Sequence, residues 1–266
     1  RDFCLSRGLG DVYKRQGGDP EVIPTLKYED FLKYHEEYYH PSNSYIYIYG
    51  DMDVNERLEY LDREYLSDFD VSDVDIHANI ERQAAFDKPV YETKPYAITE
   101  DESLEDNTYL SYNAVIGTSV DAKLYLAFQI LDYALVMTPG APVKQALLDA
   151  GISTDVYSSY ETSLYQPVYS IVAKNSNSKE QDRFVSVIND TLEKLVKDGI
   201  NERTIEAGIN YYEFKYREAD YGPYPKGLMY YLTMMDSWLY DETKPFIHIE
   251  AVSYTHLRAH ETGRNL

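Results

Sequence analysis

The chain has 266 residues, 44% of them hydrophobic, which is enough for one large or two ordinary domain cores and excludes wholesale disorder. It carries 25 Lys and Arg against 46 Asp and Glu, a net charge of −21, so we expect no binding to nucleic acid or to an anionic membrane. No uninterrupted apolar run reaches the ~18–20 residues of a membrane helix. The single cysteine, Cys4, excludes an internal disulfide and a thiolate zinc site.

The two ends of the chain lack the hydrophobic periodicity of folded protein. The DNA encoding Ser6–Gln16 can be written so that its reverse complement, read in another frame, encodes Val252–Glu261. Two unrelated protein termini would almost never encode both strands of one oligonucleotide. We therefore expect residues 1–16 and 252–266 to be translated sequencing adapter, an artefact. We expect 17–251 to be an internal fragment of a longer protein.

The first part of this fragment predicts, in chain order, a helix over 26–40, a strand over 45–49 and a helix over 54–67. Thr25 is the expected N-cap of the first helix, and Asp53 opens a capping box for the second. Because one strand and two helices cannot complete a core, residues 17–70 are interpreted as the C-terminal end of a domain.

Residues 71–95 are acidic and aperiodic, which predicts a linker, with one or two edge strands over 90–98. The expected second domain covers 96–251. Here the sequence predicts, in chain order, a strand over 108–116, a helix capped by Ser119, a helix over 141–150 ended by Gly151, and paired strands over 154–160 and 168–173. Three helices are expected to follow: one over 178–199, one that begins at Asn201, and one over 224–240. The strands do not alternate singly with helices, so the predicted fold class is α+β with mainly antiparallel sheet.

Two pairs of histidines are candidate metal ligands. His35 and His40 lie five residues apart, which places them ~140° apart around a helix, so we interpret them as one packed and one capping histidine. His256 and His260, with Glu261 beside them, have the four-residue spacing of a helical zinc motif. They fall in the adapter-like tail, so neither pair is assigned a function.

No residue can be assigned a catalytic, cofactor-binding or metal-binding role from the sequence. The acidic runs 68–75 and 100–106 do not have the ligand positions of a calcium loop and are interpreted as solvated. The pairs Tyr211-Tyr212 and Tyr230-Tyr231 could line a peptide-binding surface, but half-buried packing explains them more simply. No Ser-His-Asp or Cys-His arrangement is present.

Several motifs resemble one family in the same order along the chain. They are Gly17-Gly18-Asp19-Pro20, Tyr39-His40-Pro41-Ser42-Asn43, Pro139-Gly140-Ala141-Pro142, Leu147-Leu148 with Gly151-Ile152, Lys197-Asp198-Gly199-Ile200, and Gly227-Leu228-Met229 with Trp238. Together they resemble the presequence-protease branch of the pitrilysin/insulinase (inverzincin) zinc metallopeptidases. The resemblance covers most of 17–251.

This resemblance implies four related α+β domains that close around a chamber in which unstructured oligopeptides are degraded. In the family, zinc is held by an H-x-x-E-H helix and a downstream Glu, which lie before the segment that matches Gly17. The motif does not occur in this sequence. The resemblance therefore implies a zinc-dependent parent, whereas this fragment would supply non-catalytic chamber wall and be inactive alone.

Two alternatives remain open at this point. The fragment could belong to a catalytically inactive homologue that acts as a structural or partner subunit, or it could be an independent acidic, tyrosine-rich binding module. The family works in the bacterial cytoplasm and in organelle interiors, and we expect a cytoplasmic location.

Overall fold

The computed structural model describes residues 22–71, 81–103 and 105–250. They belong to two compact units, one ending at Asn79 and the other beginning at Ile80. Each unit is described by itself.

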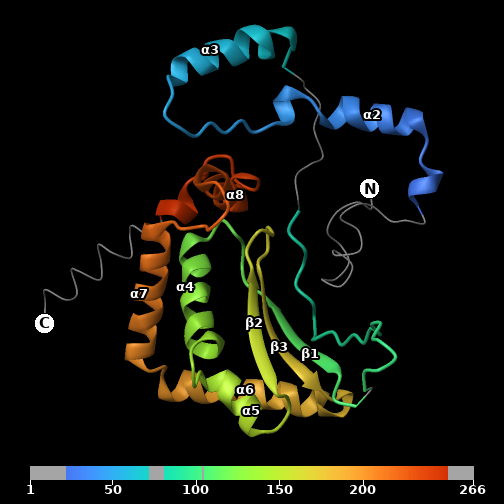
Figure 1. Ribbon diagram of the computed structural model, residues 1–266, viewed down its shortest axis with the longest axis vertical. Coiled ribbons are helices and arrows are strands. Elements are labelled where there is room, and N and C mark those ends of the chain that lie inside the picture. Colours follow the sequence, from blue (N-terminus) through green and yellow to red (C-terminus); the bar gives the residue numbers. More distant parts are fainter. Residues whose placement is uncertain (1–21, 72–80, 104, 251–266) are drawn as a thin grey trace, which may run out of the picture. The chain divides into compact units, whose positions relative to one another are not determined.

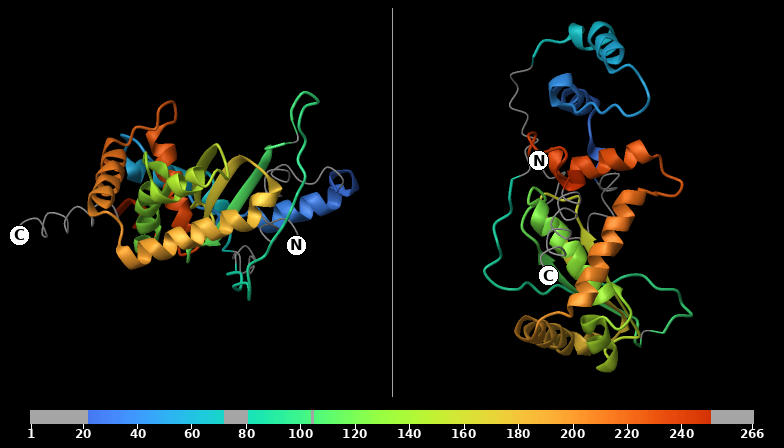
Figure 2. Two further views of the ribbon diagram at one scale, coloured as in Figure 1. Left: turned by 90° about the horizontal axis from the view of Figure 1, so that it is seen from below. Right: turned by 90° about the vertical axis from the view of Figure 1, so that its left-hand side faces the viewer.

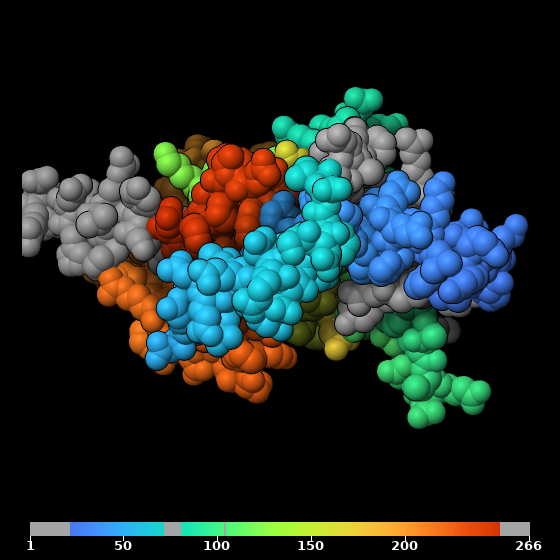
Figure 3. Space-filling model, turned by 90° about the horizontal axis from the view of Figure 1, so that it is seen from above, coloured from blue at the N-terminus to red at the C-terminus, as the bar shows by residue number. Residues whose placement is uncertain are grey.

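The first unit is helical. Its elements are η1 (Ile23–Thr25), α2 (Tyr28–Tyr38), η2 (Pro41–Asn43), α3 (Val54–Glu64) and η3 (Leu66–Asp68). Both predicted helices are therefore present, but none of the residues 22–71 is buried. The apolar side chains Phe31 of α2 and Leu58 of α3 are 62% and 52% exposed. In the space-filling view α3, coloured light blue, lies at the surface (Figure 3).

Two expectations for this unit are wrong in detail. Residues 45–49 do not form a strand, because a strand needs a hydrogen-bonded neighbour and residues 22–71 contain no strand that could pair with them. Thr25 does not cap α2: its hydroxyl donates to Val22 O at 2.8 Å within η1, and the helix begins at Tyr28. Asp53 does cap α3, since its carboxylate accepts hydrogen bonds from the backbone N–H groups of Asn55 and Glu56.

The second unit is a three-stranded antiparallel sheet with helices (Figure 1). Its elements are β1 (Thr108–Val115), α4 (Ala122–Asp132), η4 (Tyr133–Met137, a π-helix), α5 (Pro142–Asp149), β2 (Asp155–Glu161), β3 (Val168–Ser176), η5 (Ser178–Glu180), α6 (Gln181–Asp198), α7 (Glu202–Glu218) and α8 (Lys226–Trp238). The strand order is β1-β3-β2. This arrangement confirms the predicted α+β class with antiparallel pairing.

One face of the sheet forms the core. Alternate residues of β3, Tyr169, Ile171 and Ala173, are buried, and they pack with Leu147 of α5 and Phe184 of α6. The alternation follows from strand geometry, because successive side chains point to opposite faces. Helix α7 lies beside α4 in both further views (Figure 2).

One stretch of the described residues, Ala122–Asp149, is long and apolar enough on average to cross a membrane. The sequence expectation was based on uninterrupted runs of apolar residues. This stretch contains polar residues as well, but its mean hydropathy is still high enough to meet the criterion for a membrane-spanning helix. In the structure it is divided into α4, η4 and α5, and its residues Val136 and Val143 are buried in the core. Its apolar side chains therefore serve to cover the sheet.

The boundaries in the second unit depart from the predictions at two places. Residues 90–98 form no strand, so the expected edge strands are absent from that stretch. The N-cap of α4 is Asp121, which accepts from Leu124 N at 3.0 Å, and not Ser119. The predicted left-handed glycine after α5, Gly151, has φ of +66°, and Asn201 caps α7 as expected.

Candidate functional site: an open sheet face

The face of the sheet opposite the core is exposed and polar. The cross-strand register places its side chains in rows that each run from β1 through β3 to β2. Three of these rows are Ser111–Val172–Tyr157, Asn113–Ser170–Ser159 and Val115–Val168–Glu161. Tyr157 and Val115 are 44% and 52% exposed. An open face of this kind is typical of an antiparallel sheet that covers a core with its other face.

The middle row contains a hydrogen-bonded cluster. The Ser111 hydroxyl donates to Asn113 Oδ1 at 2.9 Å, and the Ser170 hydroxyl of β3 donates to the same oxygen at 2.7 Å. Two donors on one carbonyl oxygen fix the plane of the amide group. The amide of Asn113 is therefore held in one orientation in the middle of an exposed surface.

At one end of the same face lies the positive charge of β3. Lys174 Nζ lies 5.9 Å from the ring centroid of Tyr109, within cation–π range. Across the strands Lys174 is the partner of Asp155, which also lies 3.9 Å from Lys144 Nζ. Charges on this face are thus confined to its ends, whereas the two rows that contain Ser111 and Asn113 are uncharged.

Buried polar groups gather between the sheet and the helices. Asp132 of α4 accepts a hydrogen bond from the Tyr169 hydroxyl at 2.9 Å, and burial raises the pKa of this carboxyl. The same burial, together with the nearby Asp132 charge, raises the pKa of Tyr169 far above its usual value. Burial also raises the pKa of Asp236 on α8 to about 6. These carboxyl groups are candidate acids by pKa alone.

Neither carboxyl group has the surroundings of a catalytic acid. Asp132 is 7% exposed, so no substrate can reach it. Asp236 accepts from the Thr162 hydroxyl at 3.3 Å and faces Glu161 rather than a nucleophile. The bond of Asp132 links α4 to β3, and that of Asp236 links α8 to the residue that follows β2, which is a structural role.

His248 is a third buried titratable group. Its Nε2 lies 2.6 Å from Ser119 O, and because a carbonyl can only accept, Nε2 carries the proton. The ring stacks on Tyr125 with centroids 3.8 Å apart, and burial lowers the pKa of the imidazole. His248 therefore fastens the segment after α8 to the loop that precedes α4.

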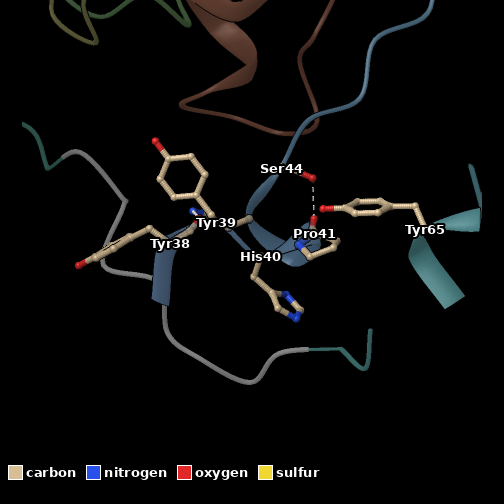
Figure 4. Close-up of a pocket in the computed structure, with 7 residues that line it drawn as sticks. Tyr38, Tyr39, His40, Pro41, Ser44 and Tyr65 are labelled. Atoms are coloured by element: carbon tan, nitrogen blue, oxygen red, sulfur yellow. Dashed lines mark hydrogen bonds between the residues drawn. The ribbon is translucent and has the colours of Figure 1, made fainter. Parts of the chain in front are cut away.

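A shallow hollow in the first unit has a volume of about 280 Å³ and is lined by residues around η2 and by Tyr65. The Tyr65 ring points toward Pro41, whereas the side chains of Tyr38, Tyr39 and His40 point in different directions (Figure 4). Because these groups do not converge on a common point, the hollow lacks the geometry of a binding site.

Of the histidines singled out in the sequence, His35 and His40 are among the described residues, and neither belongs there to a group of three or more possible metal ligands. His35 is exposed and stacks on Tyr39 at 4.6 Å between ring centroids. His40 Nδ1 accepts from Ser42 N at 3.2 Å, so His40 caps the start of η2 and not the end of α2, whose C-cap is Tyr39. His256 and His260 lie outside the described residues.

The predicted tyrosine pairs are packed against neighbouring groups. Tyr212 is 9% exposed and its hydroxyl lies 3.9 Å from the sulfur of Met137, while Tyr211 stacks on Tyr133 at 5.2 Å between centroids. Tyr230 lies edge-on to Tyr221 at 6.1 Å. The sequence did not indicate Asn113, because its partner Ser170 lies on another strand and only the pairing register brings them together.

Comparison with known proteins agrees with the resemblance. Residues 25–212 match the family described as the peptidase M16 inactive domain. The chain belongs to the M16 peptidase family. It is 44% identical over 234 residues to Protein HypA of Clostridium perfringens, covering 88% of this chain and 24% of that protein.

A plant protein and a solved structure are also similar to parts of the chain. The chain is 35% identical over 241 residues to presequence protease 1 of Arabidopsis thaliana, covering 90% of this chain and 22% of that protein. The inactive peptidase domain of a zinc protease from Bordetella parapertussis is 14% identical, with a TM-score of 0.41, covering 55% of this chain and 84% of that chain. The chain thus spans about a quarter of the length of the two relatives.

The zinc that the family implies does not fit the described residues. They contain no group of three or more His, Cys, Asp or Glu side chains that could hold a metal ion. A catalytic zinc needs three protein ligands and an open position. No step of peptide hydrolysis can therefore be assigned to these residues.

Proposed function

We propose that this chain is part of a zinc-dependent metallopeptidase that degrades unstructured oligopeptides, in which it supplies non-catalytic wall to a closed chamber. One observation carries the proposal. A sheet covered by helices on one face leaves exposed on the other a polar, aromatic surface that includes Tyr109, Asn113 and Tyr157. Membership of the M16 family supports it.

The charge of the chain suggests a preference among substrates. With a net charge of −21, the wall attracts cationic peptides and repels anionic ones, an effect that weakens with salt. Basic, unfolded peptides such as targeting-type sequences are therefore the proposed substrates, and the proposed location of the parent is the cytoplasm. No nucleic acid or membrane partner is proposed.

The full-length protein provides the test. Its peptidase activity should be abolished by a zinc chelator and restored by zinc. Matched basic and acidic peptides should differ in kcat/KM at low salt and converge at high salt. Equal rates at low salt would refute the charge preference, and chelator-insensitive cleavage would refute zinc dependence.

The match to a domain described as inactive does not separate the proposal from the inactive-homologue alternative, because a non-catalytic domain fits both. Full-length protein that folds, binds no zinc and cleaves neither peptide would support this alternative.

A further inference from the structure

We infer that the Gln166 side chain is a latch that fixes residues 83–96 to the second unit and thereby limits the length of chain that joins the two units. We call residues 83–96 the strap. The latch acts on the main chain of Gln83, the first residue of the strap. The inference goes beyond the proposed function, because it concerns how the units are joined and holds whatever the parent protein cleaves.

Gln166 holds Gln83 by both of its main-chain groups. The Gln83 N–H donates to Gln166 Oε1 at 2.7 Å, and Gln166 Nε2 donates to Gln83 O at 3.2 Å. A side-chain amide used in this way satisfies the same donor and acceptor that a neighbouring strand would satisfy. Because the contact involves only the main chain of the strap, it does not depend on which side chain stands at position 83.

The main chain on either side of Gln166 is held in place in the turn between β2 and β3. Tyr165 O accepts a hydrogen bond from Ser119 N at 2.9 Å. Pro167 O accepts from Ile116 N at 2.8 Å. Pro167 is fully buried, and the Tyr165 ring stacks on another tyrosine ring. The Gln166 amide is therefore presented from a fixed backbone, which reduces the entropy lost when it binds the strap.

Packing does not hold the strap, because residues 81–97 are all exposed. In Figure 1 this teal segment contains neither helix nor strand. Pro89 and Pro95 favour that irregular conformation, because proline lacks an N–H and restricts the residue before it. Among the described residues, the hydrogen bonds that join 81–95 to the rest of the second unit are the two made with Gln166. Loss of this one side chain should therefore release the segment.

The other end of the strap is anchored at the start of β1. The Tyr96 hydroxyl lies 2.8 Å from Asn107 Oδ1 and also contacts Asn107 O. The Tyr96 ring lies edge-on to Tyr109, with centroids 5.6 Å apart. Release by Gln166 would therefore extend as far as Tyr96, which adds up to about 45 Å of extended chain to the connection. A single side chain thus controls a large change in the length of the tether.

Trypsin provides a direct test, because residues 81–96 contain one bond that it cleaves readily. That bond is Arg82–Gln83, since Lys88 and Lys94 each precede a proline. The nitrogen of this bond is the Gln83 N–H that the latch holds, so cleavage requires the latch to open. Digestion of the full 266-residue chain, followed by mass spectrometry, measures how fast the fragment that begins at Gln83 appears.

We expect Gln166→Ala to accelerate this cleavage about three- to tenfold, as the loss of one to two exposed hydrogen bonds provides. Gln83→Ala keeps both main-chain groups and should be cleaved at the wild-type rate. Gln145→Ala removes another surface glutamine, which donates to Asp149, and should also leave the rate unchanged. Thermal unfolding followed by circular dichroism confirms that each variant is folded.

A second measurement tests the tether itself. Dyes attached at Glu59→Cys of α3 and Asp190→Cys of α6, both exposed positions, report the distance between the units by single-molecule fluorescence transfer in a Cys4→Ser background. Gln166→Ala should broaden the distribution of distances. Equal cleavage rates for the wild type and Gln166→Ala overturn the latch. Faster cleavage with an unchanged distribution overturns its control of the tether.

Discussion

Asp236 is a carboxylate held among groups that do not compensate its charge, and replacing it with Asn should stabilise the chain near neutral pH. Its hydrogen-bond donor is the Thr162 hydroxyl, at 3.3 Å, and the charge of Glu161, which is also negative, adds to the rise in its pKa. Burial raises the pKa of Tyr125 and of Tyr216, and the negative charge of Asp236 adds to both shifts. The amide introduced by Asp236→Asn keeps an acceptor for Thr162 and removes the buried charge.

The magnitude follows from the pKa of Asp236, which burial raises from 3.8 to about 6. The folded state then binds the proton more tightly than the unfolded state, so the free energy of unfolding falls as pH rises from about 4 to above 6. The full effect is about 3 kcal/mol. Because the site is partly open to water, we expect Asp236→Asn to gain about 1–2 kcal/mol at pH 7 and nothing below pH 4.

Urea unfolding at several pH values between about 4 and 8 measures the difference between the two proteins. The difference should grow through about pH 4–6 and then level off. Asp241→Asn is a matched control with the opposite sign, because hydrogen bonds from Thr243 and Lys244 lower the pKa of Asp241. A difference for Asp236→Asn that is constant across this range, or a destabilised variant at neutral pH, would refute the reasoning.

Three further predictions concern the backbone, the core and the metal. Gly117→Ala should lower the free energy of unfolding more than Gly140→Ala. Both positions have positive φ, +56° and +73°, so a side chain at either costs about 1–2 kcal/mol in backbone strain. A Cβ at Gly117 would in addition lie 2.5 Å from the Leu124 side chain. Tyr169→Phe should lose about 1–3 kcal/mol by removing one of the donors to the buried Asp132 carboxylate, whereas Tyr224→Phe, 61% exposed, should be neutral; thermal unfolding measures both pairs. Metal analysis of the purified chain should find no stoichiometric zinc, and peptide assays no hydrolysis; one tightly held zinc per chain would contradict the first.

The elements that sequence patterns predicted well are those whose signals are local. Gly151 ends α5 because only a residue that tolerates positive φ fits there, and Asn201 opens α7 through a hydrogen bond two residues away. Strands β2 and β3 are short alternating segments close together in the chain. Their pairing needs no distant partner, so alternation and proximity were sufficient.

The predictions that failed depended on partners far away in the chain. The run Tyr45–Tyr49 has strong strand propensity, yet propensity cannot form a strand without a neighbour that supplies hydrogen bonds. The cap of α4 is Asp121 rather than Ser119 because the Ser119 backbone is used elsewhere: its N–H donates to Tyr165 O and its carbonyl accepts from His248. Such contacts are set by tertiary packing and leave no local signal.

The same limit applies to the candidate site and to the excess of 29 Tyr over 8 Phe. The composition shows that tyrosine is unusually frequent, but it does not indicate the reason. The second unit supplies a reason for part of the excess: two of its tyrosine rings pack beside the helices while their hydroxyl groups donate to buried side chains. Tyr169 donates to Asp132 at 2.9 Å and Tyr216 to Gln129 at 3.0 Å. Phenylalanine would fill the same volume but leave these acceptors unpaired, at about 1–3 kcal/mol each. A core that retains polar residues on its helices therefore selects tyrosine over phenylalanine, independently of any ligand.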